Sequence, residues 1–258
     1  NNLFELSSLV GVAQFLDRTP VVYTNKNAQF ERMIRDSNDT MPGLVEQILV
    51  VNGTKPTESH TVYFNTRTGV YEDPRILKDF QDTHLNVQGQ WYQRVSKISK
   101  KQKFALFVQN DHKKFDEHFI RASLEFIEQK VKDRTTRVVL FGDSLQFMQR
   151  IFNDSVLSTE KDPILLNSTA HFISQNSQSE DLIYAKVNCD AVLISAAHST
   201  FGWWMGFVSK GAAVYYQDVR VTKDAVYKSG RLHPADYYPS EWTPLRMADD
   251  NSTIVESY

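Results

Sequence analysis

The chain has 258 residues and a mass of 29.7 kDa, which leaves room for one large domain or two modest ones and excludes a disulfide-stapled miniprotein. Lys and Arg total 29 against 31 Asp and Glu, so the net charge of −2 provides no basic field for a nucleic acid or an anionic membrane. Hydrophobic residues make up 41% and charged residues 23%, as in an ordinary folded domain. An anionic ligand must therefore be bound by a local arrangement of residues.

The first part of the chain predicts a mixed α/β arrangement. Apolar residues recur at steps of three and four between Leu3 and Arg18, which predicts a helix that buries one stripe. Thr19-Pro20 ends that helix, and residues 20–23 predict a short buried strand. Residues 36–90 mix turn signals with one further strand expected at 61–64.

From residue 103 onward, short apolar runs alternate with helical patterns. Strands are expected at 104–108, 138–141, 164–166, 191–195 and 212–216, with helices at 119–132, 145–152, 181–187 and 201–209. This alternation is typical of βαβ units and predicts a doubly wound parallel sheet covered on both faces. We therefore expect an α/β half at 1–100 and a Rossmann-like half at 101–258.

A sheet of this kind binds its ligand beyond the carboxyl ends of its strands, which nominates the loops 109–114, 142–144 and 195–200. Ser199 and Thr200 stand where a helix is expected to begin. Their hydroxyls and the free backbone N–H groups of the first turn would form an anion pocket suited to a phosphate. The alternative is that Ser199 or Thr200 only caps the helix.

Several motifs are missing from the sequence. It has no Gly-x-Gly-x-x-Gly and no Gly-Lys-Ser/Thr loop, which weighs against a dinucleotide oxidoreductase or a nucleoside triphosphatase. Scattered histidines and the single Cys189 offer no zinc spacing, and no Asp-x-Asp is present to chelate a metal-bound nucleotide sugar. The absence of Gly-x-Ser-x-Gly argues against an α/β-hydrolase. A metal-free binder of a phosphate or nucleotide remains.

Two signals bear on the compartment. A lone cysteine on its own favours the cytosol, whereas five Asn-x-Ser/Thr sequons favour the lumen of the secretory pathway: Asn38, Asn52, Asn153, Asn167 and Asn251. No run approaches the roughly 18 to 20 apolar residues of a membrane-spanning helix. The chain begins without Met, inside the first turn of a predicted helix, so we expect an upstream portion with an anchor or signal to be missing.

Residues 195–207 read Ser-Ala-Ala-His-Ser-Thr-Phe-Gly-Trp-Trp-Met-Gly-Phe and resemble a motif of the α-1,2-fucosyltransferase family. Similar blocks follow the same order along the chain. They are Asn2-Leu3-Phe4-Glu5 with Arg18-Thr19-Pro20-Val21, residues 138–143 with Phe147, Asp181-Leu182 with Cys189, and residues 237–242. The last block resembles that of nematode members, so the chain is identified as a divergent, nematode-like relative.

The resemblance implies a GT-B fold of two facing Rossmann-like halves, with the acceptor half at 1–100 and the donor half at 101–258. It also implies transfer of fucose from GDP-fucose to a hydroxyl of a galactose-containing glycan, in α-1,2 linkage, with inversion and without a metal or other cofactor. The expected location is the Golgi lumen, with membrane attachment only through an anchor outside this segment.

The sequence departs from the family at one motif. His-x-Arg-Arg-x-Asp, whose arginines grip the GDP phosphates in the family, falls on residues 107–111, where Asp111 is the surviving match. Gln109 and Asn110 provide neither the positive charge of arginine nor its two parallel N–H donors. We expect this difference to weaken the free energy of phosphate binding by several kcal/mol. The cations that could replace the lost charge are His112, Lys113, Lys114 and Arg121.

The family resemblance and the expected position of ligands beyond the carboxyl ends of the strands together assign the candidate roles. Asp111 is the candidate base for the acceptor hydroxyl, and the candidate donor-binding residues are Gln109, Asn110, Asp143, Ser199, Thr200 and Phe201. One of Trp203 and Trp204 could face a sugar, with core packing expected for the other. The aromatic residues Tyr237, Tyr238 and Trp242 could stack on a sugar ring, or they could anchor the C-terminal tail across the domain. The alternatives to an active transferase are a degenerate relative that binds glycan or nucleotide without turnover, and a cytosolic nucleotide-binding domain.

Overall fold

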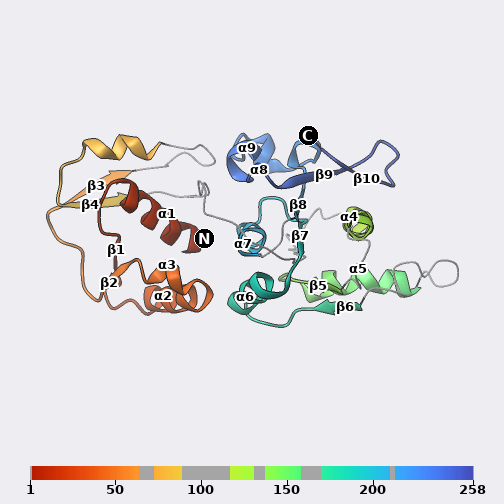
Figure 1. Ribbon diagram of the computed structural model, residues 1–258, viewed down its shortest axis with the longest axis horizontal. Helices are drawn as coiled ribbons and strands as arrows, with labels where there is room; N and C mark the ends of the chain where they lie inside the picture. Colours follow the sequence, from red (N-terminus) through yellow and green to blue (C-terminus); the bar gives the residue numbers. More distant parts are fainter. Residues whose placement is uncertain are drawn as a thin grey trace. The chain divides into compact units, whose positions relative to one another are not determined.

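The structure is a computed structural model that describes residues 2–63, 73–88, 117–130, 137–157, 170–209 and 213–257 (Figure 1). It separates into two compact units, one made of 1–99 with 225–238 and the other of 100–224 with 239–258. The strands expected at 104–108 and 164–166 lie outside the described residues. The assignment of an acceptor half at 1–100 and a donor half at 101–258 stays a prediction.

The first unit holds two parallel strand pairs and several short helices. Its elements are α1 (Asn2–Phe15), β1 (Val21–Tyr23), α2 (Ala28–Thr40), α3 (Pro42–Val45), β2 (Leu49–Val51), β3 (Ser59–Tyr63), η1 (Pro74–Asp79), β4 (His84–Gln88), α8 (Ala225–Lys228) and α9 (Pro234–Tyr237). β1 pairs with β2 and β3 with β4, both in parallel. Leu6 and Val10 of α1 pack with Leu44 and Ile48 in the core of this unit.

Helix α1 forms where the apolar period predicts it, but it ends at Phe15 rather than Arg18. Asp17 adopts a left-handed conformation with φ of 54°, and the Arg18 N–H donates to the Ala13 carbonyl at 2.8 Å. The Asp17 N–H donates to the Gln14 carbonyl at 3.3 Å, which completes a Schellman motif. The helix therefore stops before Thr19-Pro20 because its last carbonyls are already satisfied.

The second unit carries most of the elements expected after residue 103. They are α4 (Glu117–Lys130), β5 (Arg137–Leu140), α5 (Leu145–Leu157), β6 (Ala170–Ile173), α6 (Gln178–Asn188), β7 (Ala191–Ile194), α7 (Thr200–Val208), β8 (Ala213–Gln217), η2 (Val219–Val221), β9 (Thr243–Met247) and β10 (Ile254–Glu256). β5 pairs with β6, β7 with β8, and β8 with β9, all in parallel. The mixed α/β class with parallel sheets is confirmed.

Besides β2 and β4 of the first unit, which the sequence did not predict, three strands of the second unit differ from the prediction. β6 and β9 were not predicted, and β10 pairs antiparallel with β9 at the edge of the sheet, so this sheet is not purely parallel. A turn within 248–253 joins β9 to β10, and Ala248 N–H donates to the Thr253 carbonyl at 2.8 Å. Such a short connection can join antiparallel neighbours only, because a parallel pair needs a long crossover.

Helices cover both faces of the sheet around β7, whose four residues are all buried. Ala191 and Leu193 join a core cluster with residues of α4, α5 and β8, including Phe119 and Tyr215. Side chains alternate along a strand, so Val192 and Ile194, both fully buried, face the opposite layer. In that layer α7 packs against β7 and beside α6 (Figure 1).

Helix α7 approaches the sheet closely because Gly206 has no side chain. A Cβ placed there would lie 2.9 Å from Val214 Cγ1 and 3.0 Å from Trp242 Cη2. Trp203 stacks on Phe207 with centroids 5.0 Å apart and lies 5.5 Å from Trp242. The helix is apolar on all sides, as expected for one buried between a sheet and other elements.

We expect Gly206→Ala to lower the free energy of unfolding by about 1 to 3 kcal/mol, because Val214 and Trp242 are buried and must move. Gly11→Ala is the matched control, since Gly11 lies in α1 with nothing within 4 Å of the added Cβ. The control should raise stability by up to about 1 kcal/mol through helix propensity. Equal effects of the two substitutions in denaturant titrations would contradict the close packing of α7.

Candidate functional site

The carboxyl end of β7 leads directly into the first turn of α7. After Ile194 the chain passes through Ser195 to His198, and Ser199 caps the helix that begins at Thr200. The Ser199 N–H donates to the Ala196 carbonyl at 2.9 Å, which closes a tight turn before the helix. The loop 195–200 thus lies where a parallel sheet presents its ligand site.

Ser199 is a helix cap in this structure. Its Oγ accepts a hydrogen bond from the Gly202 N–H at 3.1 Å, and the residue is 8% exposed. Ser199 therefore caps α7, and a contact of Ser199 with a donor stays a prediction. Thr200 and Phe201 are half-buried in the first turn, whose N–H groups carry the positive end of the helix dipole.

Ser195 begins the same loop with a buried hydroxyl. The residue is 1% exposed, and its Oγ has no hydrogen-bond partner among the described residues. A buried polar group in a native fold is normally satisfied, and the usual exceptions mark a bound water, an ion or a functional site.

His198 and Asp224 form a close side-chain contact that no sequence pattern predicts. Nδ1 of His198 lies 3.0 Å from Oδ2 of Asp224, and their side chains are 38% and 17% exposed. The Nδ1 atom itself is buried. The contact is one of charge and proximity rather than an aligned hydrogen bond. His198 lies inside the recognised motif, but its partner follows a strand and a 3-10 helix, so no local spacing reveals the pair.

Asp143 lies in the loop between β5 and α5, and it is exposed. The neighbouring Ser144 Oγ accepts from the Phe147 N–H at 3.4 Å, so Ser144 rather than Asp143 caps the first turn of α5. The loop is at the carboxyl end of β5, as predicted, and a contact between Asp143 and a nucleotide sugar stays a prediction.

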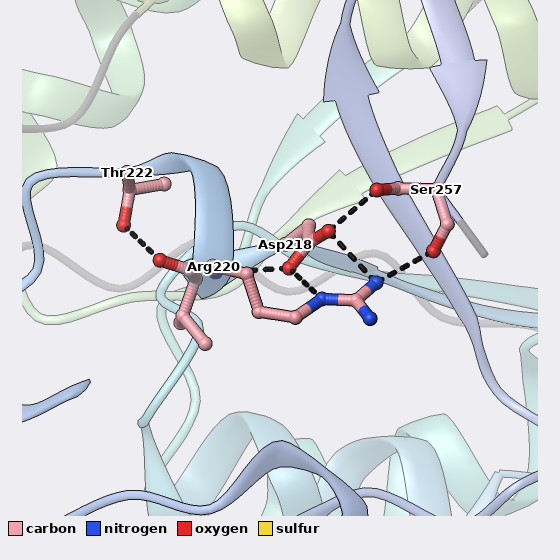
Figure 2. Close-up of polar contacts among 5 residues, drawn as sticks. Asp218, Arg220, Thr222 and Ser257 are labelled. Atoms are coloured by element: carbon pink, nitrogen blue, oxygen red, sulfur yellow. Dashed lines mark hydrogen bonds and ion pairs between the residues drawn. The ribbon is translucent and has the colours of Figure 1, made fainter. Parts of the chain in front are cut away.

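Beyond the carboxyl end of β8, Asp218 anchors a polar network (Figure 2). Its side chain, 2% exposed, accepts from Arg220 Nε at 2.8 Å, Arg220 Nη2 at 2.9 Å and Ser257 Oγ at 2.5 Å. Burial would raise the pKa of Asp218, but these bonds outweigh burial and hold the pKa below its usual value. The network ties η2 to the chain end beyond β10, since Arg220 Nη2 also donates to the Ser257 carbonyl at 2.7 Å.

Burial raises the pKa of three further groups in this unit, Asp181, Tyr216 and Cys189. Burial raises the pKa of Asp181, although Ser174 Oγ donates to its Oδ1 at 2.5 Å. Burial also raises the pKa of Tyr216 on β8 to about 12, with the Asp218 charge adding to the effect. Burial of Cys189 raises the pKa of its thiol strongly, so this cysteine is inert.

Arg121, a candidate to replace the lost charge, contacts α5, and its role toward a phosphate stays a prediction. Its Nε donates to the Ile151 carbonyl at 3.1 Å and its Nη2 to the Arg150 carbonyl at 3.2 Å, both on α5. The other predicted site residues at this edge, Gln109, Asn110 and Asp111 with His112, Lys113 and Lys114, lie outside the described residues.

The candidate sugar-stacking aromatics are core residues. Trp203, Trp204, Tyr237, Tyr238 and Trp242 are each 8% exposed or less. Trp203 and Trp204 pack edge to face with centroids 5.3 Å apart, and Tyr237 and Tyr238 do so at 4.8 Å. The core-packing alternative therefore holds for both tryptophans.

The described part of the chain offers neither a metal cluster nor a membrane-spanning helix. Within the described ranges, no group of three or more His, Cys, Asp or Glu is placed to hold a metal ion. Among the same residues, no helix combines the length and apolarity needed to cross a bilayer.

The chain is similar over its whole length to proteins of Caenorhabditis elegans. It is 34% identical to a protein provisionally named galactoside 2-alpha-L-fucosyltransferase svh-11, over 100% of this chain and 79% of that protein. The chain belongs to the galactoside 2-alpha-L-fucosyltransferase family. It is also 29% identical to C06E1.7, provisionally named a glycosyltransferase, over 99% of this chain and 79% of that protein. A third relative, named galactoside 2-alpha-L-fucosyltransferase, is 27% identical over 95% of this chain and 74% of its own length.

No protein-family model matches the chain, and no solved structure matches it. In this fucosyltransferase family member, the structure gives roles to several residues of the motif at 195–207. Ser199 caps α7, Gly202 provides the capped N–H, and Gly206 allows close packing on β8. The motif therefore encodes a buried helix whose N-terminus meets the carboxyl end of β7.

We expect Asp218→Asn to lower the free energy of unfolding by about 2 kcal/mol at pH 7, because bonds to a buried carboxylate are lost. The folded-state pKa lies below the unfolded value, so the stabilisation is complete above about pH 4 and is lost as the pH falls through the folded-state pKa. The difference between variant and unmodified protein should therefore shrink at pH 2 to 3 in urea titrations.

Asp249→Asn is the matched control, since that carboxylate is fully exposed and lies 3.6 Å from Arg246 Nη1. Its removal should leave stability unchanged within error at both pH values. An Asp218→Asn loss that is independent of pH would contradict the assigned role of the ionised carboxylate.

Proposed function

We propose that this protein transfers fucose from GDP-fucose to a hydroxyl of a galactose-containing glycan, in α-1,2 linkage and with inversion. The observation that carries the proposal is the full-length similarity to galactoside 2-alpha-L-fucosyltransferases. The loop 195–200 supports the proposal, because a diphosphate leaving group needs hydrogen-bond donors. The free N–H groups of α7 provide them, since this helix begins at Thr200, just beyond the carboxyl end of the buried parallel strand β7.

In the proposed reaction the acceptor oxygen attacks the anomeric carbon of fucose from the face opposite the diphosphate. The new C–O bond forms as the bond to the diphosphate oxygen breaks, and its electron pair leaves with GDP. Asp111 would take the acceptor proton, and the first-turn amides with Ser199, Thr200 and Phe201 would bind the phosphates together with Gln109 and Asn110. Asp143, exposed at the end of β5, would contact the nucleotide sugar.

The proposed architecture is GT-B, with the two Rossmann-like halves serving acceptor and donor. We propose that the reaction needs no metal or other cofactor, as the family resemblance implies. Helix N-terminal amides and cationic side chains would then stabilise the leaving diphosphate alone.

A degenerate relative that binds glycan or nucleotide without turnover is the second candidate. The observation that favours it is the presence of Gln109 and Asn110 where the resembled family motif has arginines. An assay of fucose transfer to a galactoside acceptor distinguishes the two candidates, because an active enzyme performs this transfer and a degenerate relative does not.

The donor site is tested by calorimetric titration with GDP and GDP-fucose in the presence of EDTA. We expect micromolar binding by the unmodified chain and at least tenfold weaker binding by Thr200→Asp, because like charges would face each other at the start of α7. An acidic residue in the first turn suits the helix dipole, so the fold should persist.

Thr200→Asn is the matched control, since it has the size of Asp without the charge, and it should bind GDP within about threefold of the unmodified chain. No binding of GDP at millimolar concentration by the unmodified chain would overturn the proposed donor. Equal binding by Thr200→Asp and Thr200→Asn would overturn the position of the phosphates.

We propose further that the chain resides in the Golgi lumen and is glycosylated. The structure exposes Asn38 in α2, Asn52 after β2 and Asn251 in the turn between β9 and β10. Asn153 is part of α5, and Asn167 lies outside the described residues. At Asn251 the sequon is displayed on a turn, where Thr253 N–H donates to Asp250 Oδ1 at 3.0 Å.

We expect the protein secreted from eukaryotic cells to shift in mobility on treatment with an N-glycosidase. Asn52→Gln and Asn251→Gln should each remove one glycan increment, because both side chains are exposed in turns. A matched control is Asn188→Gln, which is exposed but is not part of a sequon. An unchanged mobility for all variants and for the unmodified protein would contradict a luminal location.

A further inference from the structure

The loop that precedes α7 contains one ionisable side chain. Residues 195–200 read Ser-Ala-Ala-His-Ser-Thr, so His198 is the residue there that can carry positive charge. It lies two residues before the first residue of α7, at the carboxyl end of β7. A cation at this place adds to the positive end of the helix dipole, and the two together favour an anion.

The contact with Asp224 orients the ring of His198. Nδ1 is buried and lies 3.0 Å from Asp224 Oδ2, so the carboxylate fixes which edge of the ring faces the protein. The side chain is nevertheless 38% exposed, so its accessible area lies on the other ring atoms. Among the described residues, Nε2 has no hydrogen-bond partner, and it donates a hydrogen bond when the ring is protonated.

Two arginines of the same unit contact carboxylates or carbonyls. Arg220 is bonded to Asp218 and Ser257, and Arg121 to carbonyls of α5. By contrast, Ser195 in the same loop as His198 has a buried hydroxyl without a partner among the described residues. The loop thus combines a satisfied helix cap with a partly exposed imidazole whose outer ring edge a ligand's oxygens can contact.

We propose that His198, oriented by Asp224, binds the diphosphate of the nucleotide-sugar donor and replaces part of the charge that arginines supply elsewhere in the family. The inference rests on the proposed function. Nε2–H donates to a phosphate oxygen before and after transfer, so the histidine neither gains nor loses a proton. The bond between fucose and the diphosphate oxygen breaks with its electron pair leaving on GDP, and the charge of His198 stabilises that leaving group. Asp224 is a positioning residue.

The test compares GDP with guanosine, which lacks phosphates, in calorimetric titrations of the full chain. His198→Gln should weaken GDP binding about tenfold or more, since a charge-assisted hydrogen bond is lost, and should leave guanosine binding within about twofold. His198→Lys should restore GDP binding to within about threefold of the unmodified chain, because it returns a cation. Asp224→Asn should weaken GDP binding less than His198→Gln does, while guanosine binding stays unchanged.

His118→Gln is the matched control, because His118 is exposed on α4 and its Nε2 is 2.8 Å from the Asn251 carbonyl oxygen, a contact far from the loop in sequence. It should bind both ligands as the unmodified chain does. Unchanged GDP binding by His198→Gln, or equal losses for GDP and guanosine, would overturn the inference while leaving the proposed function standing. Absence of GDP binding by the unmodified chain would instead overturn the proposed donor, and this inference with it.

Discussion

The second unit depends on the close approach of α7 to its sheet. Gly206 permits that approach, because any side chain there would overlap Val214 or Trp242. The aromatic side chains of the helix then fill the space around it, with Trp203 against Phe207 and Trp242. A helix buried on all sides has one orientation that satisfies its packing, so its N-terminus is held at the carboxyl end of β7. The position of the proposed phosphate site is thus a consequence of core packing.

The same packing buries the two tryptophans of the motif. Trp203 and Trp204 are 2% and 3% exposed, and they pack α7 into the core. What remains for chemistry is the polar start of α7 and the short loop before it. In a chain of net charge −2, recognition of a diphosphate requires backbone amides and a few well-placed side chains rather than a broad positive surface.

Charged groups elsewhere in the unit serve its architecture. Asp218, Arg220 and Ser257 connect the turn after β8 to the segment after β10, the edge strand of the sheet. Arg121 joins α4 to α5 through carbonyls of the latter helix. Buried or half-buried ionic contacts of this kind fix the relative positions of elements more than they add stability. The contact between His198 and Asp224 lies apart from these, at the start of α7.

The sequence by itself determined the α/β class, most elements after residue 103, the helix start at Ser199 and the family, because these depend on local periodicity, capping chemistry and ordered motifs. It misplaced the end of α1 and missed β6, β9 and the antiparallel β10, since short strands owe their pairing to partners distant in the chain. Only the tertiary structure decided that the aromatic residues are core, that Arg121 binds α5 and that Asp224 lies against His198. The physical reason is the same in each case: contacts between residues far apart in sequence follow from how elements pack, and local patterns do not encode them.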